Sequence, residues 1–161
     1  MLGELMLSRK RPPERHDLFA YDYVLAPYVD AGHYSLFIMC HMGAKDGKQP
    51  AILHLDSFPG CHDSDSIARG LARHCSVLWP FLKAEQPHSV PALYARQHPE
   101  IEPNFEGTPC FQPKVPLQAD GSQNCGPCML LFAKMFLAVG SAHVDRYLSQ
   151  AESCSGGASF L

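Results

Sequence analysis

Cys125 is the residue whose type and position most clearly suggest chemistry. It stands where a polar, turn-prone stretch, 119–124, meets a strongly apolar stretch, 125–139, which predicts a buried helix ending at Gly140. The start of a helix lowers the pKa of a thiol, because the helix dipole and the free N–H groups stabilise the thiolate. Cys125 is therefore a candidate nucleophile. The alternative interpretation is a buried structural cysteine.

His33 and Asp56 could supply a base and the group that orients it. His33 opens an apolar segment, 33–40, which predicts a buried strand, and Asp56 closes the next strand candidate, 51–56. If these strands pair, the aspartate can hydrogen-bond the histidine and fix its tautomer. Each residue alone is more simply a turn or capping residue, so the hypothesis depends on finding both beside Cys125.

Gln118 could provide a fourth element of such a site. It ends a short extended segment, 114–118, and precedes Cys125 in the chain. A side-chain amide there, together with the N–H of Cys125, could donate to the oxyanion that forms when a thiolate attacks a carbonyl. Taken alone, Gln118 is most simply a surface residue.

The elements that must position these residues begin with strands. We expect strands at 23–28, where Pro27 should stop the first of them, at 33–40 and at 51–56. The second and third should form a hairpin or lie side by side with a long connection. Either arrangement would bring the start of one strand close to the end of the other.

Helices are expected in the rest of the chain. One should begin beside Asp63 or Ser64, which can cap it, and should end or kink at Pro80. Residues 86–112 are rich in proline and show little periodicity, so irregular structure is expected there. A short amphipathic helix at about 142–150 should follow the apolar one.

The composition describes a globular domain. The chain has 161 residues, of which 46% are hydrophobic and 18% charged, values typical of a packed core. The net charge of −3 favours neither a nucleic-acid partner nor a membrane surface. The N-terminus lacks the pattern of a signal peptide, and no apolar run reaches the roughly 20 residues of a membrane span. Seven cysteines, an odd number, are expected to be thiols in the cytoplasm or nucleus.

Three segments resemble, in this order, the catalytic motifs of a known family. They are His33-Tyr34-Ser35-Leu36, then Leu53-His54-Leu55-Asp56-Ser57, then Val115-Pro116-Leu117-Gln118-Ala119-Asp120-Gly121-Ser122-Gln123-Asn124-Cys125-Gly126. The family is that of the Ulp/SENP cysteine proteases, which act on ubiquitin-like (SUMO-type) proteins. The resemblance covers about residues 20 to 150. It implies an α+β, papain-like fold (Ulp-type) with a mostly antiparallel central sheet flanked by helices.

The resemblance also implies roles for individual residues. It implies four catalytic residues and two substrate contacts: His33 as general base, Asp56 as orienting acid, Gln118 as oxyanion donor, Cys125 as nucleophile, and Tyr34 and Asn124 against the substrate. The expected reaction is hydrolysis of a peptide or isopeptide bond after the C-terminal Gly-Gly of a ubiquitin-like protein. The expected partners are such a protein and its conjugates, without nucleic acid or membrane. No cofactor and no metal is expected.

The chain departs from the family pattern at several points. Tyr34 stands where Trp is usual, Asn124 stands where Asp is usual, and the turn between Gln118 and Cys125 is one residue longer than common. The family's N-terminal Trp-Leu-Asn-Asp-type segment has no counterpart, so the chain is expected to begin partway into the domain. We expect a flexible tail at 1–17, a catalytic domain at 18–152, and a second flexible tail at 153–161.

Three other functions fit part of the sequence. A catalytically impaired module that only binds a ubiquitin-like protein would keep the same motifs. The tetrapeptide Cys125-Gly126-Pro127-Cys128 is the active-site motif of thioredoxins, but that fold needs further strands after the motif. Cys and His residues that are adjacent or closely spaced could bind zinc, although most of them fall on apolar faces: Cys40-His41, Cys61-His62, His74-Cys75 and Cys125/Cys128.

Overall fold

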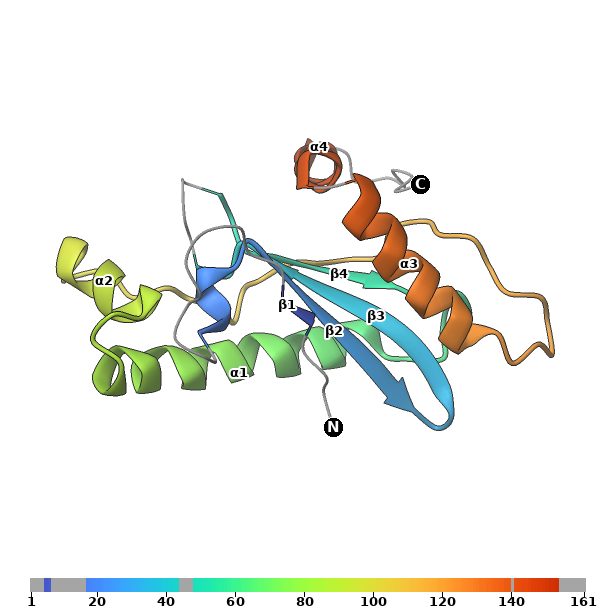
Figure 1. The fold of residues 1–161 in the computed structure, drawn as a ribbon, viewed down its shortest axis with the longest axis horizontal. Coiled ribbons are helices and arrows are strands. Elements are labelled where there is room, and N and C mark those ends of the chain that lie inside the picture. The colour runs from blue at the N-terminus through green and yellow to red at the C-terminus, as the bar shows by residue number, and fades with distance from the viewer. Residues whose placement is uncertain (1–4, 7–16, 44–47, 140, 154–161) are drawn as a thin grey trace.

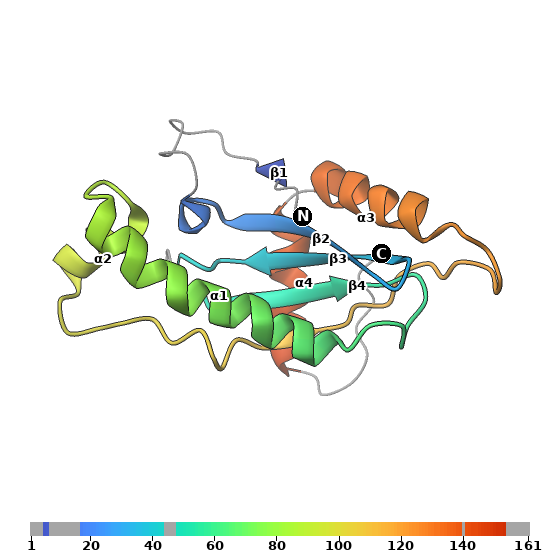
Figure 2. The same cartoon turned by 90° about the horizontal axis from the view of Figure 1, so that it is seen from below.

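The architecture is a sheet covered by helices on both faces. The computed structural model describes residues 5–6, 17–43, 48–139 and 141–153. Five strands lie side by side in chain order, and all neighbours are antiparallel except β4 and β5, which are parallel. The long helix α1 covers one face, while α3 and α4 lie on the other (Figures 1 and 2). This is an α+β arrangement with a mostly antiparallel sheet flanked by helices.

The described elements follow one another without a repeat. In chain order they are β1 Leu5–Met6, the 3₁₀ helix η1 Leu18–Ala20, β2 Tyr23–Asp30, β3 His33–Cys40, β4 Ala51–Leu55, α1 Ser64–Glu85, α2 Val90–Gln97, β5 Cys110–Phe111, α3 Cys125–Val139 and α4 Ser141–Ser153. The predicted buried strand at 33–40 and the predicted helix at 125–139 are confirmed in position and type. Both carry candidate residues for the site.

Strand β3 is buried on both faces, which explains its nearly continuous apolar sequence. Its side chains alternate: Leu36 and Ile38 pack with α3 and α4, whereas Phe37 and Met39 pack on the side of α1. All four are at most 4% exposed. Burying such a side chain contributes about 1.5–3 kcal/mol, so β3 is the part of the sheet that both helical layers hold in place.

The expectation that Pro27 stops the first strand is wrong. Strand β2 continues to Asp30, and Pro27 lies opposite Leu36 of β3. On its other side, among the described residues, β2 pairs with the two residues of β1, opposite Val24 and Leu25. A proline lacks the N–H of a ladder hydrogen bond and is tolerated where one side of the strand is unpaired. The strand therefore reaches the hairpin turn that carries the site.

In the helical half, the expected end of a helix at Pro80 and the expected irregular stretch at 86–112 both differ from the structure. Helix α1 does not end at Pro80 but continues to Glu85, because Trp79 and Leu82 on either side of the exposed proline are buried and hold both halves. The stretch 86–112 is not wholly irregular, since it contains α2 and β5. A local signal for α2 was present: Ser89 caps it by accepting the N–H of Ala92, and Pro91 lies in its first turn.

The N-terminal stretch expected to be a tail is partly structured. Leu5–Met6 form β1, and Asp17 is buried, accepting N–H groups from Phe19 and Val90. The other residues of 1–16 and the C-terminal stretch 154–161 lie outside the described residues. Among the described helices, no single one is long and apolar enough to cross a membrane; α3 and α4 meet that length only as a sharply bent pair.

Candidate active site

A tight hairpin places His33 at the rim of the sheet. Asp30 and His33 pair across β2 and β3, so the loop consists of two residues, Ala31 and Gly32. Both have positive φ angles, 48° and 79°, as a type I′ turn requires. Because this turn fixes the register of the two strands, it also fixes which end of β3 presents the imidazole.

His33 and Asp56 meet as predicted from their positions on neighbouring strands. Leu36 of β3 pairs with Leu55 of β4, so Asp56 follows β4 directly beside the start of β3. His33 Nε2 lies 2.6 Å from Asp56 Oδ1, with side chains 11% and 7% exposed. The same oxygen accepts the N–H of Phe58 at 2.9 Å. Since the aspartate holds Nε2, Nδ1 is the ring nitrogen left to exchange a proton with a thiol.

Cys125 is the first residue of α3 and lies against the hairpin turn. The N–H of Cys128 donates to the Asn124 carbonyl at 2.8 Å, so helical hydrogen bonding starts at the residue before Cys125. The Sγ atom of Cys125 lies 4.0 Å from the carbonyl oxygen of Gly32, the residue before His33. The first N–H groups of a helix have no partner within the helix, so those at the start of α3 are available to donate to a group held beside Cys125.

Gln118 is held in position by Ser57, the residue that follows Asp56. Its N–H donates to the Ser57 carbonyl at 3.0 Å, and its Oε1 accepts the Ser57 hydroxyl at 3.1 Å. Its Nε2 donates to the Ser122 carbonyl at 3.3 Å, which uses one of the two amide protons. The second proton can be given to a substrate oxygen. Sequence reasoning did not assign a role to Ser57, although it directly follows Asp56 in the second motif.

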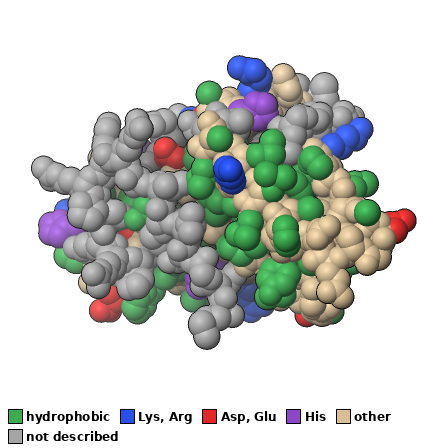
Figure 3. Space-filling model, turned by 45° about the vertical axis from the view of Figure 1, so that its right-hand side comes forward, with side chains coloured by type: hydrophobic (Ala, Val, Ile, Leu, Met, Phe, Trp, Pro, Cys, Tyr) green, Lys and Arg blue, Asp and Glu red, His purple; other side chains and the backbone are tan. Residues whose placement is uncertain are grey.

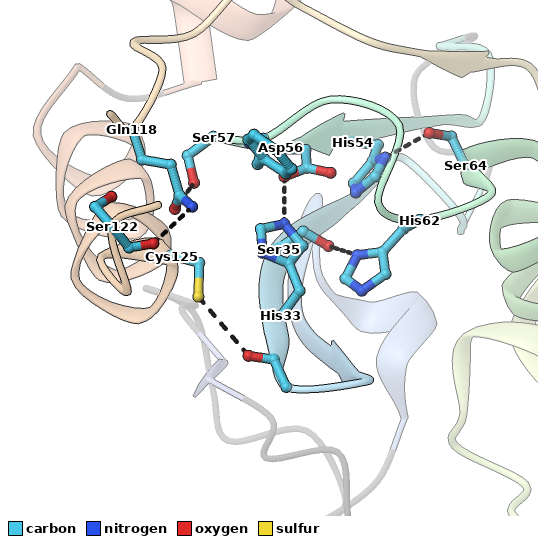
Figure 4. A network of polar contacts seen from close by, with 12 residues as sticks. His33, Ser35, His54, Asp56, Ser57, His62, Ser64, Gln118, Ser122 and Cys125 are labelled. Atoms are coloured by element: carbon cyan, nitrogen blue, oxygen red, sulfur yellow. Dashed lines mark hydrogen bonds and ion pairs between the residues drawn. The ribbon is translucent and has the colours of Figure 1, made fainter. Parts of the chain in front are cut away.

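Three of the four predicted catalytic residues share one pocket of about 750 Å³. His33, Gln118 and Cys125 all line it, while Asp56 lies behind His33 (Figure 4). Tyr34, predicted to contact substrate, also lines this pocket and is 42% exposed. Asn124, predicted for the same role, is exposed at the start of α3 but is not among the residues that line the pocket.

Two further histidines, His54 and His62, lie behind the pair, and sequence reasoning placed neither of them at this site. His62 Nδ1 lies 2.8 Å from Ser35 Oγ, and the His62 ring centre is 4.8 Å from that of His33. His54 Nδ1 lies 2.6 Å from Ser64 Oγ. Burial lowers the pKa of His54 to about 4, so this imidazole is neutral at pH 7. His54 lay within the second motif, but only the fold shows that its side chain is buried.

The two alternative chemistries receive less support from the fold. Among the described residues, only the helices α3 and α4 follow Cys128, without the strands that a thioredoxin fold requires. Cys40 and Cys75, two cysteines of the candidate zinc pairs, are buried in the core, and burial raises the pKa of Cys75 to about 12. His41 is engaged by Asp145 instead.

Comparisons with known proteins match most of the chain. The model of the Ulp1 protease family, C-terminal catalytic domain, matches residues 6–153. Two relatives from Arabidopsis thaliana are ubiquitin-like-specific protease 1D, 31% identical over 124 residues, and ubiquitin-like-specific protease 1C, 30% identical over 121. A probable ubiquitin-like-specific protease 2A from the same organism is 27% identical over 132 residues. The alignments cover 75%, 75% and 76% of this chain but only 20%, 20% and 15% of these relatives.

Proposed function

The chain belongs to the Ulp1 protease family, and on that premise we propose that it is a cysteine peptidase domain that processes or removes a ubiquitin-like modifier. The observation that carries the proposal is the convergence of Cys125, His33 and Gln118 in one pocket, with Asp56 hydrogen-bonded to the far side of the imidazole. Nucleophile, base, orienting acid and oxyanion donor are the four parts that thiol-dependent hydrolysis of an acyl group needs.

The proposed reaction runs in two steps through an acyl-enzyme. His33 Nδ1 takes the thiol proton of Cys125, and the thiolate attacks the carbonyl carbon of the scissile bond. The developing oxyanion accepts the N–H of Cys125 and the amide of Gln118. His33 then gives its proton to the leaving amine. Water, deprotonated by His33, cleaves the thioester and restores the thiol.

Asp56 acts throughout by holding the imidazole. Its 2.6 Å contact with Nε2 keeps the ring oriented and stabilises the imidazolium that exists between proton transfers. The N–H of Phe58 fixes the carboxylate in turn. This arrangement, with the nucleophile at the head of a helix that packs on the strand carrying the base, supports the proposal of a papain-like fold.

The surroundings of the pocket support a protein substrate. Leucines on and before α3 are exposed although the helix also contributes to the core: Leu117 at 66%, Leu130 at 65%, Leu131 at 47% and Leu137 at 40%. Figure 3 brings forward the side of the molecule on which α3 lies in Figure 1, and hydrophobic side chains gather on this face. Such a surface beside a reactive pocket suits docking of a folded partner. We propose a ubiquitin-like protein of the SUMO type, whose extended C-terminal Gly-Gly would reach Cys125.

Covalent probes test the proposal directly. The chain is incubated with vinyl-sulfone derivatives of SUMO, ubiquitin and other ubiquitin-like proteins, and adducts are detected by gel shift and mapped by mass spectrometry. We expect the SUMO probe to label Cys125, to label Cys128→Ser as well, and to leave Cys125→Ser unlabelled. Labelling that persists in Cys125→Ser would overturn the assignment of the nucleophile.

The same panel separates the alternatives. Binding of a ubiquitin-like protein without labelling, by a probe that labels a known protease, would favour a module that only binds. Loss of labelling in Cys128→Ser alone would favour the thiol-disulfide alternative. A stronger reaction with another modifier than with SUMO would keep the peptidase and overturn only the choice of substrate.

A further inference from the structure

A second cluster of polar side chains lies behind the proposed catalytic pair. One donor atom from each of His33, Asp56 and His62 lies within 4.8 Å of the other two. In Figure 4 His62 and His54 lie on the side of His33 away from Cys125. The proposed reaction uses His33 and Asp56 but gives no task to His62. The cluster therefore contains chemistry that the hydrolysis does not require.

Three buried atoms around this cluster lack a hydrogen-bond partner among the described residues: Asp56 Oδ2, His62 Nε2 and His54 Nε2. Their residues are only 7%, 8% and 2% exposed. Leaving a buried polar atom unpaired costs about 1–3 kcal/mol, so three of them in one place indicate a site that a ligand can satisfy. The carboxylate oxygen can only accept, and a histidine Nε2 offers a lone pair when the proton sits on Nδ1.

The tautomer that a metal requires is supported by a neighbouring hydroxyl. His62 Nδ1 lies 2.8 Å from Ser35 Oγ, which can accept the Nδ1 proton and leave the Nε2 lone pair free. Metal-binding histidines typically donate their other ring N–H to such an outer partner, which fixes the tautomer and the ring orientation. Ser35 is 1% exposed on β3, so this contact is held by the core of the sheet.

The donor set suits zinc. Two imidazoles and one carboxylate are ligands of Zn²⁺ at open sites, with bonds of about 2.0–2.2 Å that place tetrahedral donor atoms roughly 3.3 Å apart. In the cluster, the His33–Asp56 contact is 2.6 Å, and the three donor atoms lie within 4.8 Å of one another. Ligation requires the side chains to rotate until all three donors reach that spacing. Hard cations such as Mg²⁺ prefer a set of oxygens instead.

We propose that His33, Asp56 and His62 form a zinc site. The nucleophile Cys125 is not one of its ligands. His33 borders the pocket and is the most exposed of the three, so the ion enters from the pocket side. The fourth position of the ion stays open to water. Binding requires His33 to turn from its hydrogen bond with Asp56, and both residues then ligate the ion.

Zinc occupancy has a consequence for hydrolysis, which rests on the proposed function. With Asp56 and His33 bound to the ion, the imidazole can no longer take the thiol proton. The zinc-bound form is therefore inactive, and removal of zinc by a chelator restores activity. Zinc binding itself does not depend on the reaction, so the two statements are tested separately.

The binding experiment uses the Cys125→Ser chain, in which zinc cannot bind to the catalytic thiol. Titration calorimetry with zinc chloride measures affinity, and the absorption spectrum with Co²⁺ reports the ligand type. We expect one zinc per chain and a Co²⁺ spectrum without an intense thiolate band from this site. His62→Gln should weaken zinc binding at least tenfold, whereas the matched control His88→Gln, an exposed histidine, should leave it unchanged.

Several results would overturn the zinc site. Equal affinity in His62→Gln, no zinc binding at all, or a strong thiolate band that places the ion on another cysteine would each do so. If His62→Gln proves unfolded by circular dichroism, imidazole ¹⁵N shifts of the Cys125→Ser chain decide. Zinc should then move the ring nitrogens of His33 and His62 together, and unchanged shifts would contradict the site.

The activity experiment uses the unsubstituted chain. Zinc should reduce hydrolysis of a fluorogenic SUMO substrate at least tenfold, with recovery on addition of EDTA. His88→Gln should show the same zinc sensitivity as the parent chain. Zinc binding in a chain that hydrolyses no substrate would overturn the proposed peptidase and leave the zinc site intact. Hydrolysis by a chain that binds no zinc would overturn the zinc site and leave the peptidase intact.

Discussion

The two ends of strand β3 carry the same pair of residue types in different surroundings. At its start, His33 Nε2 lies 2.6 Å from Asp56 Oδ1; just after its end, His41 Nε2 lies 2.8 Å from Asp145 Oδ1. The histidines are 11% and 4% exposed at their side chains. By residue type and distance the two pairs are nearly alike, so these features alone do not identify a catalytic base.

The second pair is enclosed in a structural network. The Tyr23 hydroxyl donates to Asp145 at 2.7 Å, and Lys48 Nζ donates to the other carboxylate oxygen at 2.7 Å. Partial burial alone would raise the pKa of Asp145, but these hydrogen bonds and the one from His41 hold it below its ordinary value. The network ties α4 to the sheet.

The thiol near each pair makes the difference. Cys40, the neighbour of His41, is fully buried, and burial raises its pKa well above the ordinary value. Cys125 instead heads a helix and lines a pocket together with His33. A His–Asp pair thus becomes a candidate for catalysis only when a thiol at the start of a helix lines the same pocket as its histidine.

The largest effect is expected from replacing the cysteine near each pair. Cys125→Ser should reduce kcat/KM for a fluorogenic SUMO substrate by at least about 10⁴-fold, because the nucleophile is lost. Cys40→Ala should keep kcat/KM within a few-fold of the parent chain, although it opens a small cavity in the core. A comparable loss in Cys40→Ala, with the fold intact by circular dichroism, would remove the distinction between the two ends of β3.

A second test exchanges the acids. Asp56→Asn should lower kcat by about 10²–10⁴-fold, since the asparagine no longer stabilises an imidazolium. Asp145→Asn should leave kcat almost unchanged and lower the free energy of unfolding by about 1–2 kcal/mol through weaker hydrogen bonds. Kinetics and urea unfolding of both variants supply the measurement. Equal kcat values for the two variants would show that neither pair orients a base.

Gln118→Ala probes the proposed oxyanion donor beside the His33–Asp56 pair. The proposed mechanism assigns no such donor to the His41–Asp145 pair. Loss of one such donor should cost about 10²-fold in kcat, with KM changed little, because the interaction forms only in the transition state. Gln123→Ala is a suitable control, since this residue also lines the pocket but is exposed on the loop. A rise in KM without a fall in kcat would assign Gln118 to substrate binding.

The last contrast concerns how stability depends on pH at the two ends of β3. His54, beside the first pair, has a folded pKa lowered to about 4 by burial, so the unfolded chain takes up a proton first as the pH falls below about 6.5. This group should remove up to roughly 3 kcal/mol of stability between about pH 6.5 and pH 4. The pKa of Asp145 is lowered from its ordinary value of 3.8. The stability that this group gives the folded chain is therefore kept above pH 3.8 and lost only as the pH falls below that value.

Urea unfolding at several pH values checks this contrast. His54→Gln should flatten the stability profile between about pH 6.5 and pH 4, whereas Asp145→Asn should change the slope only below about pH 4. An unchanged slope in His54→Gln over the upper window would mean that His54 accepts its proton in the folded chain.

The parts of the fold that were predictable are those with strong local patterns. The apolar run of β3 and the apolar helix after Cys125 are long enough to identify their type, and the ends of both elements followed from the turn residues around them. Because the start of one strand meets the end of its neighbour in an antiparallel pair, the positions of His33 and Asp56 along the chain predicted their contact on the condition that the two strands pair.

The remaining features depend on distant parts of the chain. The contact between Ser57 and Gln118 joins residues far apart in sequence, and the burial of His62 depends on the loop between β4 and α1. Pro80 lies inside α1 because tertiary packing on both sides outweighs the local preference of proline. The two-residue strands β1 and β5 have too few residues to show any periodicity.

The loop between Gln118 and Cys125 has a consequence for how the chain can vary in length. Its first end is fixed to Ser57 and its second is the start of α3, while Ala119 to Ser122 form a turn closed by a 3.0 Å hydrogen bond with Gly121 at φ 73°. Lengthening such a solvent-exposed turn by a residue changes its closure entropy by only tenths of a kcal/mol. The spacing that the sequence comparison predicts to be one residue longer than common can therefore be absorbed as a wider arc, while both anchored ends keep their places.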